Sequence, residues 1–179
     1  ITGFNDEYFA RPCTGFENGH VNVGSFEVQY DKFEGAGDRG ALSFPGLPPN
    51  QWYMVDLFPG YNFNLRGSAF RSDSITPLGP NSVMIEFRGY GLLKDNPEER
   101  QQRIDHHNTI WGPFGRNLCE DLLGVTGQGV AMAPGTERRN ILHGRHENNT
   151  IHDEVGMRHF YAEWGRYLNI DPANPLNKG

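Results

Sequence analysis

The sequence has few cysteines, no excess of positive charge and no long apolar run. Among its 179 residues, Cys13 and Cys119 lie far apart and form no CxxC pair, which argues against a disulfide framework. The formal net charge of −6 counts against a nucleic-acid partner, which needs a basic face. No apolar stretch approaches the roughly 18 to 20 residues of a membrane helix. No secretory signal opens the chain. We therefore expect a soluble cytoplasmic protein without membrane association.

What the sequence does contain suits a single packed domain. The length is enough for a sizeable core. The 12 Phe, 7 Tyr and 3 Trp also argue for a packed interior. The chain begins at Ile1, with neither an initiator Met nor a targeting pattern, so we expect it to be a piece of a longer protein.

Alternation of apolar and polar residues predicts strands that each bury one face. The predicted strands are 26–30, 52–58, 61–70 and 82–93. Short connections at Pro59-Gly60 and at 77–80 suit antiparallel neighbours, which need only tight turns. Residues 1–24 are rich in turn formers and are expected to be irregular, and residues 35–50 are expected to form a long loop.

Helical patterns follow the strands. The predicted helical segments are 97–110, one that begins near Gly115, and 154–168. An N-cap, a first-turn proline and acidic residues at 95–99 indicate the start of the first helix, and Asp153 is the expected cap of the last. Residues 124–152 are expected to be mostly loop. Strands first and helices last predict an α+β domain.

The first group that could bind a metal is Asp105-His106-His107, together with Asp121 on the next helical segment. Adjacent histidines on a helix point about 100° apart and rarely bind one ion together. A solvated helix face with one half-buried histidine is therefore the favoured interpretation of this group.

A second group of metal-ligating residue types lies near the last helix. Its members are His143, His146, His152, Glu147 and Glu154. Two histidines and a carboxylate can hold non-haem Fe(II) and leave coordination positions open. However, no clear helix or strand fixes their spacing, so polar loop residues are the favoured interpretation.

The basic residues on the predicted strands allow two interpretations. Arg66 and Arg88 could meet an anionic substrate, and as strand residues they could equally be surface charges. At Phe70-Arg71 an aromatic ring adjoins a basic residue. Given the acidic balance of the chain, this pair indicates cross-strand packing rather than nucleic-acid stacking.

The segment 108–123 (NTIWGPFGRNLCEDLL) resembles a signature of the large (α) subunit of Rieske non-haem iron oxygenases, the ring-hydroxylating dioxygenase family. In that family an aromatic residue, a Gly-Pro-x-Gly turn and an acidic pair follow a charged helix. Here these are Trp111, residues 112–115 and Glu120-Asp121. The second acidic residue is the family's carboxylate ligand of the mononuclear iron, which makes Asp121 the implied catalytic residue and metal ligand.

Weaker matches extend the resemblance from about Phe26 to Leu168. Phe58-Pro59 matches a strand that ends in Phe-Pro, and residues 96–99 match the acidic start of the helix before the Gly-Pro turn. Arg158, Phe160 and Tyr161 match a closing Arg-x-Phe-Tyr helix. The implied fold is an antiparallel sheet flanked by helices, of the helix-grip type.

Several family motifs do not occur in this sequence. Cys13 and Cys119 do not fit the Cys-x-His and Cys-x-x-His ligands of a Rieske cluster, and no His-x4-His pair precedes Asp121. The expectation is therefore that residues 1–179 form the C-terminal portion of a single catalytic domain. The Rieske [2Fe-2S] domain and the two iron-binding histidines would lie outside this chain.

The activity implied by the resemblance is O2 activation at a mononuclear Fe(II), which hydroxylates a small and preferably aromatic substrate. Two alternatives to this activity remain. One is a methanesulfonate-type monooxygenase of the same architecture, and the other is a non-catalytic helix-grip binding domain. Electrons would come from NAD(P)H through a separate reductase, in some systems with a ferredoxin, and then through the Rieske cluster. Implied protein partners are the remainder of the α subunit, other α subunits in a trimer, and in some systems a β subunit.

By their places in the sheet and beside the Gly-Pro turn, six residues are expected to line the substrate pocket. They are Trp52, Met54, Phe63, Asn64, Trp111 and Asn117. Plain core packing is the alternative for the aromatic members. On the helix that carries Asp121, Leu118 and Leu122 are expected to mark the buried side, which Asp121 would approach more closely than Glu120.

Overall fold

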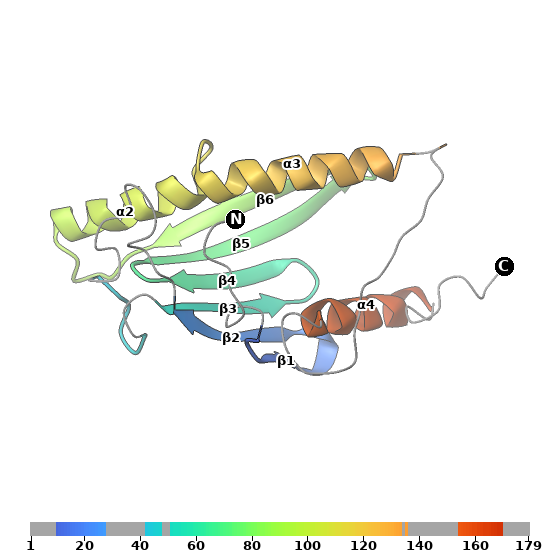
Figure 1. The fold of residues 1–179 in the computed structure, drawn as a ribbon, viewed down its shortest axis with the longest axis horizontal. Helices are drawn as coiled ribbons and strands as arrows, with labels where there is room; N and C mark the ends of the chain where they lie inside the picture. The colour runs from blue at the N-terminus through green and yellow to red at the C-terminus, as the bar shows by residue number, and fades with distance from the viewer. Residues whose placement is uncertain (1–9, 28–41, 48–50, 134, 136–153, 170–179) are drawn as a thin grey trace.

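In a computed structural model, the chain forms a six-stranded antiparallel sheet with helices on one face (Figure 1). The structure describes residues 10–27, 42–47, 51–133, 135 and 154–169. Each strand pairs with the next along the chain. The strands are β1 Cys13–Gly15, β2 Val21–Glu27, β3 Gln51–Leu57, β4 Tyr61–Arg66, β5 Ala69–Gly79 and β6 Ser82–Tyr90. The predicted α+β class and the antiparallel sheet are thus confirmed.

Two strand predictions need correction. Residues 1–24 are not irregular throughout, because β1 and the start of β2 lie within them. The predicted strand 61–70 is in fact two strands, β4 and β5, with Arg66 opposite Ala69 in the register. Gly67 takes a positive φ of 55° between them, a conformation that favours glycine and lets the chain reverse there.

The helices are α2 Pro97–Trp111, α3 Arg116–Ala131 and α4 Val155–Leu168, with a short 3-10 turn η1 at Glu17–Gly19. The first and last agree with the predicted helices at 97–110 and 154–168. The helix that begins after Gly115 continues to Ala131, so residues 124–131 are helical rather than loop. The three glycines within 124–131 suggested a loop but do not break the helix. Glu154 is the N-cap of α4, and the expected cap Asp153 lies outside the described residues.

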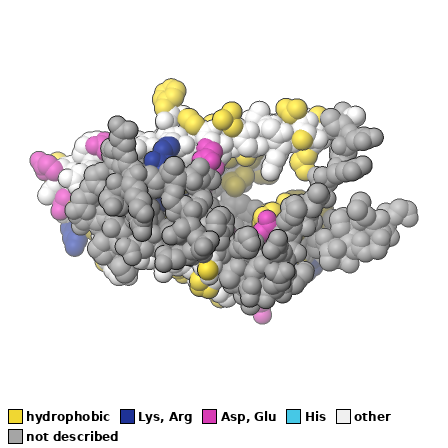
Figure 2. Space-filling view, viewed as in Figure 1, with side chains coloured by type: hydrophobic (Ala, Val, Ile, Leu, Met, Phe, Trp, Pro, Cys, Tyr) yellow, Lys and Arg dark blue, Asp and Glu magenta, His cyan; other side chains and the backbone are white. Residues whose placement is uncertain are grey.

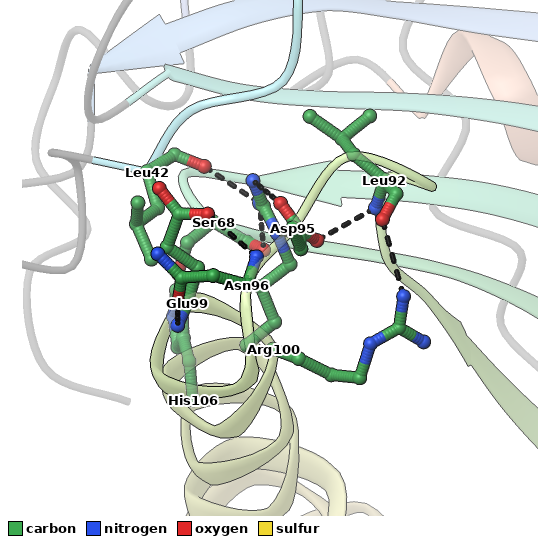
Figure 3. Close-up of polar contacts among 9 residues, drawn as sticks. Leu42, Ser68, Leu92, Asp95, Asn96, Glu99, Arg100 and His106 are labelled. Atoms are coloured by element: carbon green, nitrogen blue, oxygen red, sulfur yellow. Dashed lines mark hydrogen bonds and ion pairs between the residues drawn. The ribbon is translucent and has the colours of Figure 1, made fainter.

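A capping box fixes the start of α2 (Figure 3). The Asn96 side chain accepts a hydrogen bond from the Glu99 backbone N–H at 2.9 Å. The Glu99 carboxylate in turn accepts one from the Asn96 backbone N–H, also at 2.9 Å. Two N–H groups that the helix leaves unpaired are satisfied in this way.

Further along α2, Arg103 and His106 attach the helix to the sheet, and Figure 3 labels His106 together with Ser68, the residue that both contact. Arg103 forms a buried ion pair with Asp95 at 2.8 Å and donates to the carbonyl oxygens of Leu42 and Ser68 at 2.6 and 2.9 Å. The Ser68 hydroxyl and His106 Nδ1 are 2.7 Å apart. Because Ser68 lies in the turn between β4 and β5, these contacts set the position of α2 over the sheet.

Both α2 and α4 cover the same face of the sheet. Val155 of α4 packs into a core cluster with Cys13, Val21 and Val23 on β1 and β2. On β6, the Cβ position of Gly89 lies 3.3 Å from the His107 ring of α2, which allows this close approach. No helix in the part of the chain that the structure describes is long and apolar enough to cross a membrane.

Candidate active site

A row of polar side chains crosses the sheet face beneath the helices. In the strand register, Met54 faces Asn64 and Asn64 faces Arg71. Two residues further along β3, Asp56 lies directly opposite Asn62 on β4, and Asn62 lies opposite Asp73 on β5. Directly opposed residues of an antiparallel pair share a face, so all of these side chains point toward the helices. We call five of these residues the polar row. They are Asp56, Asn62, Asn64, Arg71 and Asp73.

Arg71 is the charged centre of the polar row. Its Nε and Nη2 donate to Asp73 Oδ2 at 3.1 and 2.8 Å. The two side chains are only 5% and 6% exposed. Burial lowers the pKa of Arg71 to about 10, and the neighbouring charge of Arg66 acts in the same direction, while Asp73 opposes the shift. Burial likewise raises the pKa of Asp73, against the charge of Arg71 and its hydrogen bonds. The ion pair therefore only partly offsets the cost of removing these charges from water.

Asp56 lies on the other side of Asn62 from Asp73. Asn62 lies between the two carboxylates in the strand register, and its side chain favours their ionised forms. At Asp56 the effects of burial and of the negative charge of Asp73 outweigh that of Asn62, and the pKa of Asp56 rises to about 6. Asp56 is therefore a carboxyl group that changes from its protonated to its ionised form close to neutral pH.

Trp111 ends α2 directly over Arg71. The Arg71 guanidinium carbon lies 3.3 Å from the centre of the Trp111 ring and 5.1 Å from that of Phe87. Gly112 and Gly115 form the turn into α3 and are both buried, and a Cβ added at either would lie within 2.6 Å of backbone atoms. The Gly-Pro-x-Gly turn is thus a close approach of backbone that only glycine allows at these two positions.

Asp121 lies near the N-terminal end of α3, on the same helix face as Asn117 four residues earlier. Asp121 is exposed on α3. Desolvation by its surroundings and the neighbouring charge of Glu120 raise its pKa, and the charge of Arg71 opposes this rise. Asp121 and Arg71 therefore act on each other across the space between α3 and the sheet. Leu118 is half-buried but Leu122 is 48% exposed, so the expected buried side of this helix is wrong at Leu122.

The structure brings together most of the predicted pocket residues. Met54 and Asn64 contact each other, with the Asn64 amide donating to Met54 Sδ at 3.8 Å. Trp52 is on the same face and is buried, with the guanidinium carbons of Arg11 and Arg66 at 4.8 and 4.4 Å from its ring centre. Trp111 covers Arg71 in the same row, and half-buried Asn117 is on α3 beyond it.

Phe63 is the exception. Strand residues alternate between faces, and Phe63 faces Val55 and Ser72 on the side away from the polar row. There it packs with Tyr61 and Phe70, whose ring centres lie 5.2 and 6.0 Å away. The structure therefore does not place Phe63 with Asn64, its neighbour in sequence.

A cavity of about 390 Å³ adjoins the polar row between the sheet and α4. Figure 2 shows the molecule hollowed between α3 and α4, with hydrophobic side chains visible inside. Asp56 and Asn62 provide polar groups in a wall that is otherwise mainly apolar, with Met54, Met157 and Phe160 among its members. A small organic molecule could be enclosed on this side of the sheet.

The groups considered as metal sites do not assemble among the described residues. The Asp105 carboxylate accepts from Gln101 at 2.8 Å, His106 is paired with Ser68, and His107 lies against Gly89. His143, His146, Glu147 and His152 lie outside the described residues, and only Glu154 of that group is within them. Within the described ranges, no three His, Cys, Asp or Glu side chains are grouped so that they could hold a metal ion.

Arg71 was not among the site residues expected from the sequence. Arg66 and Arg88 were the basic candidates there, and Arg88 proves to be an exposed surface charge paired with Glu86 at 3.1 Å. The prediction of cross-strand packing at Phe70-Arg71 is confirmed, since Phe70 is paired with Tyr90 and their ring centres are 5.1 Å apart. The available signal for Arg71 was its alternation with Asp73, which places two opposite charges on one strand face.

Comparison with known proteins gives two relatives that match almost the whole chain. Over 175 residues it is 69% identical to the methanesulfonate monooxygenase hydroxylase subunit alpha of Methylosulfonomonas methylovora, covering 98% of this chain and 42% of that protein. Over 164 residues it is 37% identical to the 2-aminobenzenesulfonate 2,3-dioxygenase subunit alpha of an Alcaligenes species, covering 91% of this chain and 41% of that protein.

The chain thus spans about two fifths of the length of the curated relatives it matches. No protein-family model matches it. Both relatives are α subunits of oxygenases, as the Gly-Pro-x-Gly turn and the acidic pair before Leu122 indicated. Over almost its whole length the chain is therefore similar to oxygenase α subunits, as the resemblance to the Rieske non-haem iron oxygenases led us to expect.

Proposed function

We propose that this chain is the part of a terminal oxygenase that carries the carboxylate ligand of a mononuclear Fe(II) and much of the substrate site. The proposed reaction is hydroxylation of a small organic sulfonate with O2. The observation that carries the proposal is the place of Asp121 on α3, directly after the Gly-Pro-x-Gly turn that follows Trp111, with Trp111 itself packed on the buried Arg71. Asp121 and Arg71 each shift the pKa of the other. The names of both relatives support a sulfonate as the substrate class, in place of the aromatic class as such.

The donors present fit an iron centre only in part. A carboxylate oxygen suits Fe(II), and the facial arrangement of non-haem oxygenases needs two histidines beside it. Asp121 would supply that oxygen, and no second and third ligand are grouped with it among the described residues. We propose that the two histidines, like the Rieske [2Fe-2S] cluster, are supplied from outside this chain. When bound, the iron would supply the activation of O2.

The residues of this chain would bind, orient and shield the substrate. The rings of Trp111 and Phe87 cover one side of Arg71, which keeps water away from the guanidinium. Apolar side chains of the adjoining cavity, such as Met54 and Phe160, would hold the organic part of the substrate. Asn64 is 4% exposed and its amide could orient a polar group of the substrate.

The remaining components of the proposed system follow from the resemblance. Electrons would pass from NAD(P)H through a separate reductase, with or without a ferredoxin, to the Rieske cluster and then to the iron. Other α subunits in a trimer, and in some systems a β subunit, would be the assembly partners. Dependence on NAD(P)H fits the cytoplasm, which we propose as the location.

Replacing the two acidic residues one at a time in the full-length protein tests this proposal. Asp121→Ala should abolish hydroxylation and deplete the mononuclear iron while the absorption of the Rieske cluster stays intact. Glu120→Ala is the matched control and should keep most of the iron, because the two side chains diverge by about 100° on the helix. An essential Glu120 beside a dispensable Asp121 would refute the assignment. A full-length protein without iron and labile sulfide would favour a helix-grip binding domain instead.

A further inference from the structure

Arg71 has a hydrogen-bonding group for which the described structure provides no acceptor. Two of its nitrogens, Nε and Nη2, share the same oxygen of Asp73. The third nitrogen, Nη1, is buried and has no hydrogen-bond partner. The side chain as a whole is only 5% exposed, so bulk water does not satisfy this group. A buried N–H group without an acceptor is costly, and for a charged group the cost is larger.

The surroundings of Arg71 favour an additional negative charge. Burial is the main cause of the depressed pKa of Arg71, and the positive charge of Arg66 adds to it. Asp73 opposes both effects but is itself poorly solvated. An anion bound at Nη1 would satisfy the missing hydrogen bond and stabilise the guanidinium charge at the same time.

We propose that Arg71 is the substrate-binding residue that recognises the anionic head of the substrate, a sulfonate, through Nη1. This inference rests on the proposed function and deepens it by naming the group that selects the substrate class. A sulfonate carries three equivalent oxygen acceptors and a permanent negative charge at neutral pH. It can therefore accept from a buried guanidinium without first losing a proton.

The position of Arg71 suits recognition close to the reacting atoms. Its charge acts on Asp121, the proposed iron ligand, and its planar group lies under the Trp111 ring. In a small sulfonate, the carbon to be hydroxylated is bonded directly or nearly so to the sulfur. The anion site and the metal ligand must then lie near each other, and Arg71 and Asp121 are close enough for each to shift the pKa of the other.

Other arginines of the sheet fit this role less well. Arg66 points toward the same face, but its guanidinium lies over Trp52, 4.4 Å from the ring centre. Arg88 lies on the opposite face, where its side chain is 69% exposed and pairs with Glu86. Arg88 is therefore a suitable control position, since it is a strand arginine that the proposed site does not involve.

The test measures how the full-length protein binds methanesulfonate and its neutral isostere methanesulfonamide, by titration calorimetry. Removal of Arg71 alone would leave Asp73 as an unpaired buried carboxylate, so the comparison is made in an Asp73→Asn background. Going from Asp73→Asn to the double variant Arg71→Gln/Asp73→Asn should raise the Kd for methanesulfonate by at least about 30-fold. The Kd for methanesulfonamide should change by less than about 3-fold, because the lost interaction depends on the anionic charge.

Two single variants keep the result interpretable if the double variant folds poorly. Arg71→Lys retains a positive charge but not the planar fork, so the Kd for methanesulfonate should rise by about 5- to 10-fold. Arg88→Gln should leave both Kd values within about 2-fold of the original protein, because exposed pairs contribute little. Equal weakening of the anion and the isostere, or no change for either, would overturn the role of Arg71.

The result for Arg71 can be separated from that for the proposed function. The sulfonate should bind Asp121→Ala protein as well, because the anion site does not require turnover. One outcome is that Arg71 variants lose sulfonate binding, while neither the original protein nor any variant hydroxylates the sulfonate. In that case the oxygenase proposal fails and this inference stands. If hydroxylation depends on Asp121 but the selectivity for the anion is unchanged in the Arg71 variants, this inference fails and the oxygenase proposal stands.

Discussion

The guanidinium carbon of Arg71 lies 3.3 Å from the centre of the Trp111 ring, so the sheet and the end of α2 meet in direct contact. A cation this close to the face of an indole is attracted by its π electrons. The contact joins two segments forty residues apart in sequence. It also places the residue before the Gly-Pro-x-Gly turn against the polar row.

Trp111→Leu in the full-length protein should change which substrates or positions are hydroxylated, while the iron content stays normal. The smaller side chain uncovers Arg71 and enlarges the proposed site. The loss of the cation–π contact and of buried ring area should also lower the free energy of unfolding by about 2 kcal/mol. Product analysis and a denaturant titration measure the two effects.

Phe114→Leu is the matched control for Trp111, because Phe114 is 96% exposed only three residues away. It should leave products and stability nearly unchanged. If every substrate tried gave the original product distribution with Trp111→Leu, Trp111 would be a packing residue and not part of the site.

Arg103→Met should lower the free energy of unfolding by about 3 kcal/mol, because it leaves Asp95 as an uncompensated buried charge. Burial works against the ionised Asp95, and hydrogen bonds from Arg103 and the Leu92 N–H nevertheless hold the pKa of Asp95 below its usual value. A urea titration at pH 7 checks the prediction. Arg100→Met is the control, since the exposed Arg100 side chain donates to the Leu92 carbonyl at 3.2 Å and pairs with no buried carboxylate among the described residues. Equal effects of the two variants would mean that the ion pair does not hold α2 in place.

The sheet and the ends of α2 could be predicted because local rules determine them. Period-two alternation indicated the strands, and Asn96, Pro97 and Glu99 form the cap that the sequence led us to expect. Trp111 and Asp121 were identified only through a family resemblance, because spacing alone does not distinguish Asp121 from Glu120.

Two of the errors concern local structure, and one concerns a residue whose role depends on distant segments. Phe63 and Asn64 were both placed in the pocket, although adjacent strand residues point to opposite faces. Arg71 became significant only in the folded register, which brings it to Asp73 and beneath Trp111. Three glycines suggested a loop after Leu123, yet α3 continues through them, because glycine weakens a helix without forbidding it.

The 179-residue chain alone should not retain Fe(II) or hydroxylate a sulfonate. A single carboxylate holds Fe(II) weakly, and among the described residues no group of three ligand side chains surrounds Asp121. Anaerobic loading with ferrous iron, followed by desalting and metal analysis, should leave far less than one ion per chain. Retention of one ion that Asp121→Ala abolishes, or turnover with a reductant and O2, would contradict the need for outside histidines.

Asp56→Asn should stabilise the full-length protein at pH 8 and have little effect at pH 4. Burial and the charge of Asp73 raise the pKa of Asp56 to about 6, so the folded protein holds this proton more tightly than the unfolded chain does. Well below pH 4 the group is protonated in both states and does not affect stability. As the pH rises from 4 through 6, ionisation increasingly favours unfolding, and above 6 the cost is constant at about 2 kcal/mol after allowance for solvent screening.

Urea titrations of the two proteins between pH 4 and 8 measure this effect. The difference in unfolding free energy should grow through the window from pH 4 to 6 and then level off. Asp105→Asn, at an exposed position of α2, is the control and should change stability by less than about 0.5 kcal/mol at any pH. Asp73→Asn should shift the Asp56 window to lower pH, because it removes the negative charge that helps to raise the pKa of Asp56. An Asp56→Asn difference that stays the same from pH 4 to 8 would mean that Asp56 does not titrate near neutrality in the folded protein.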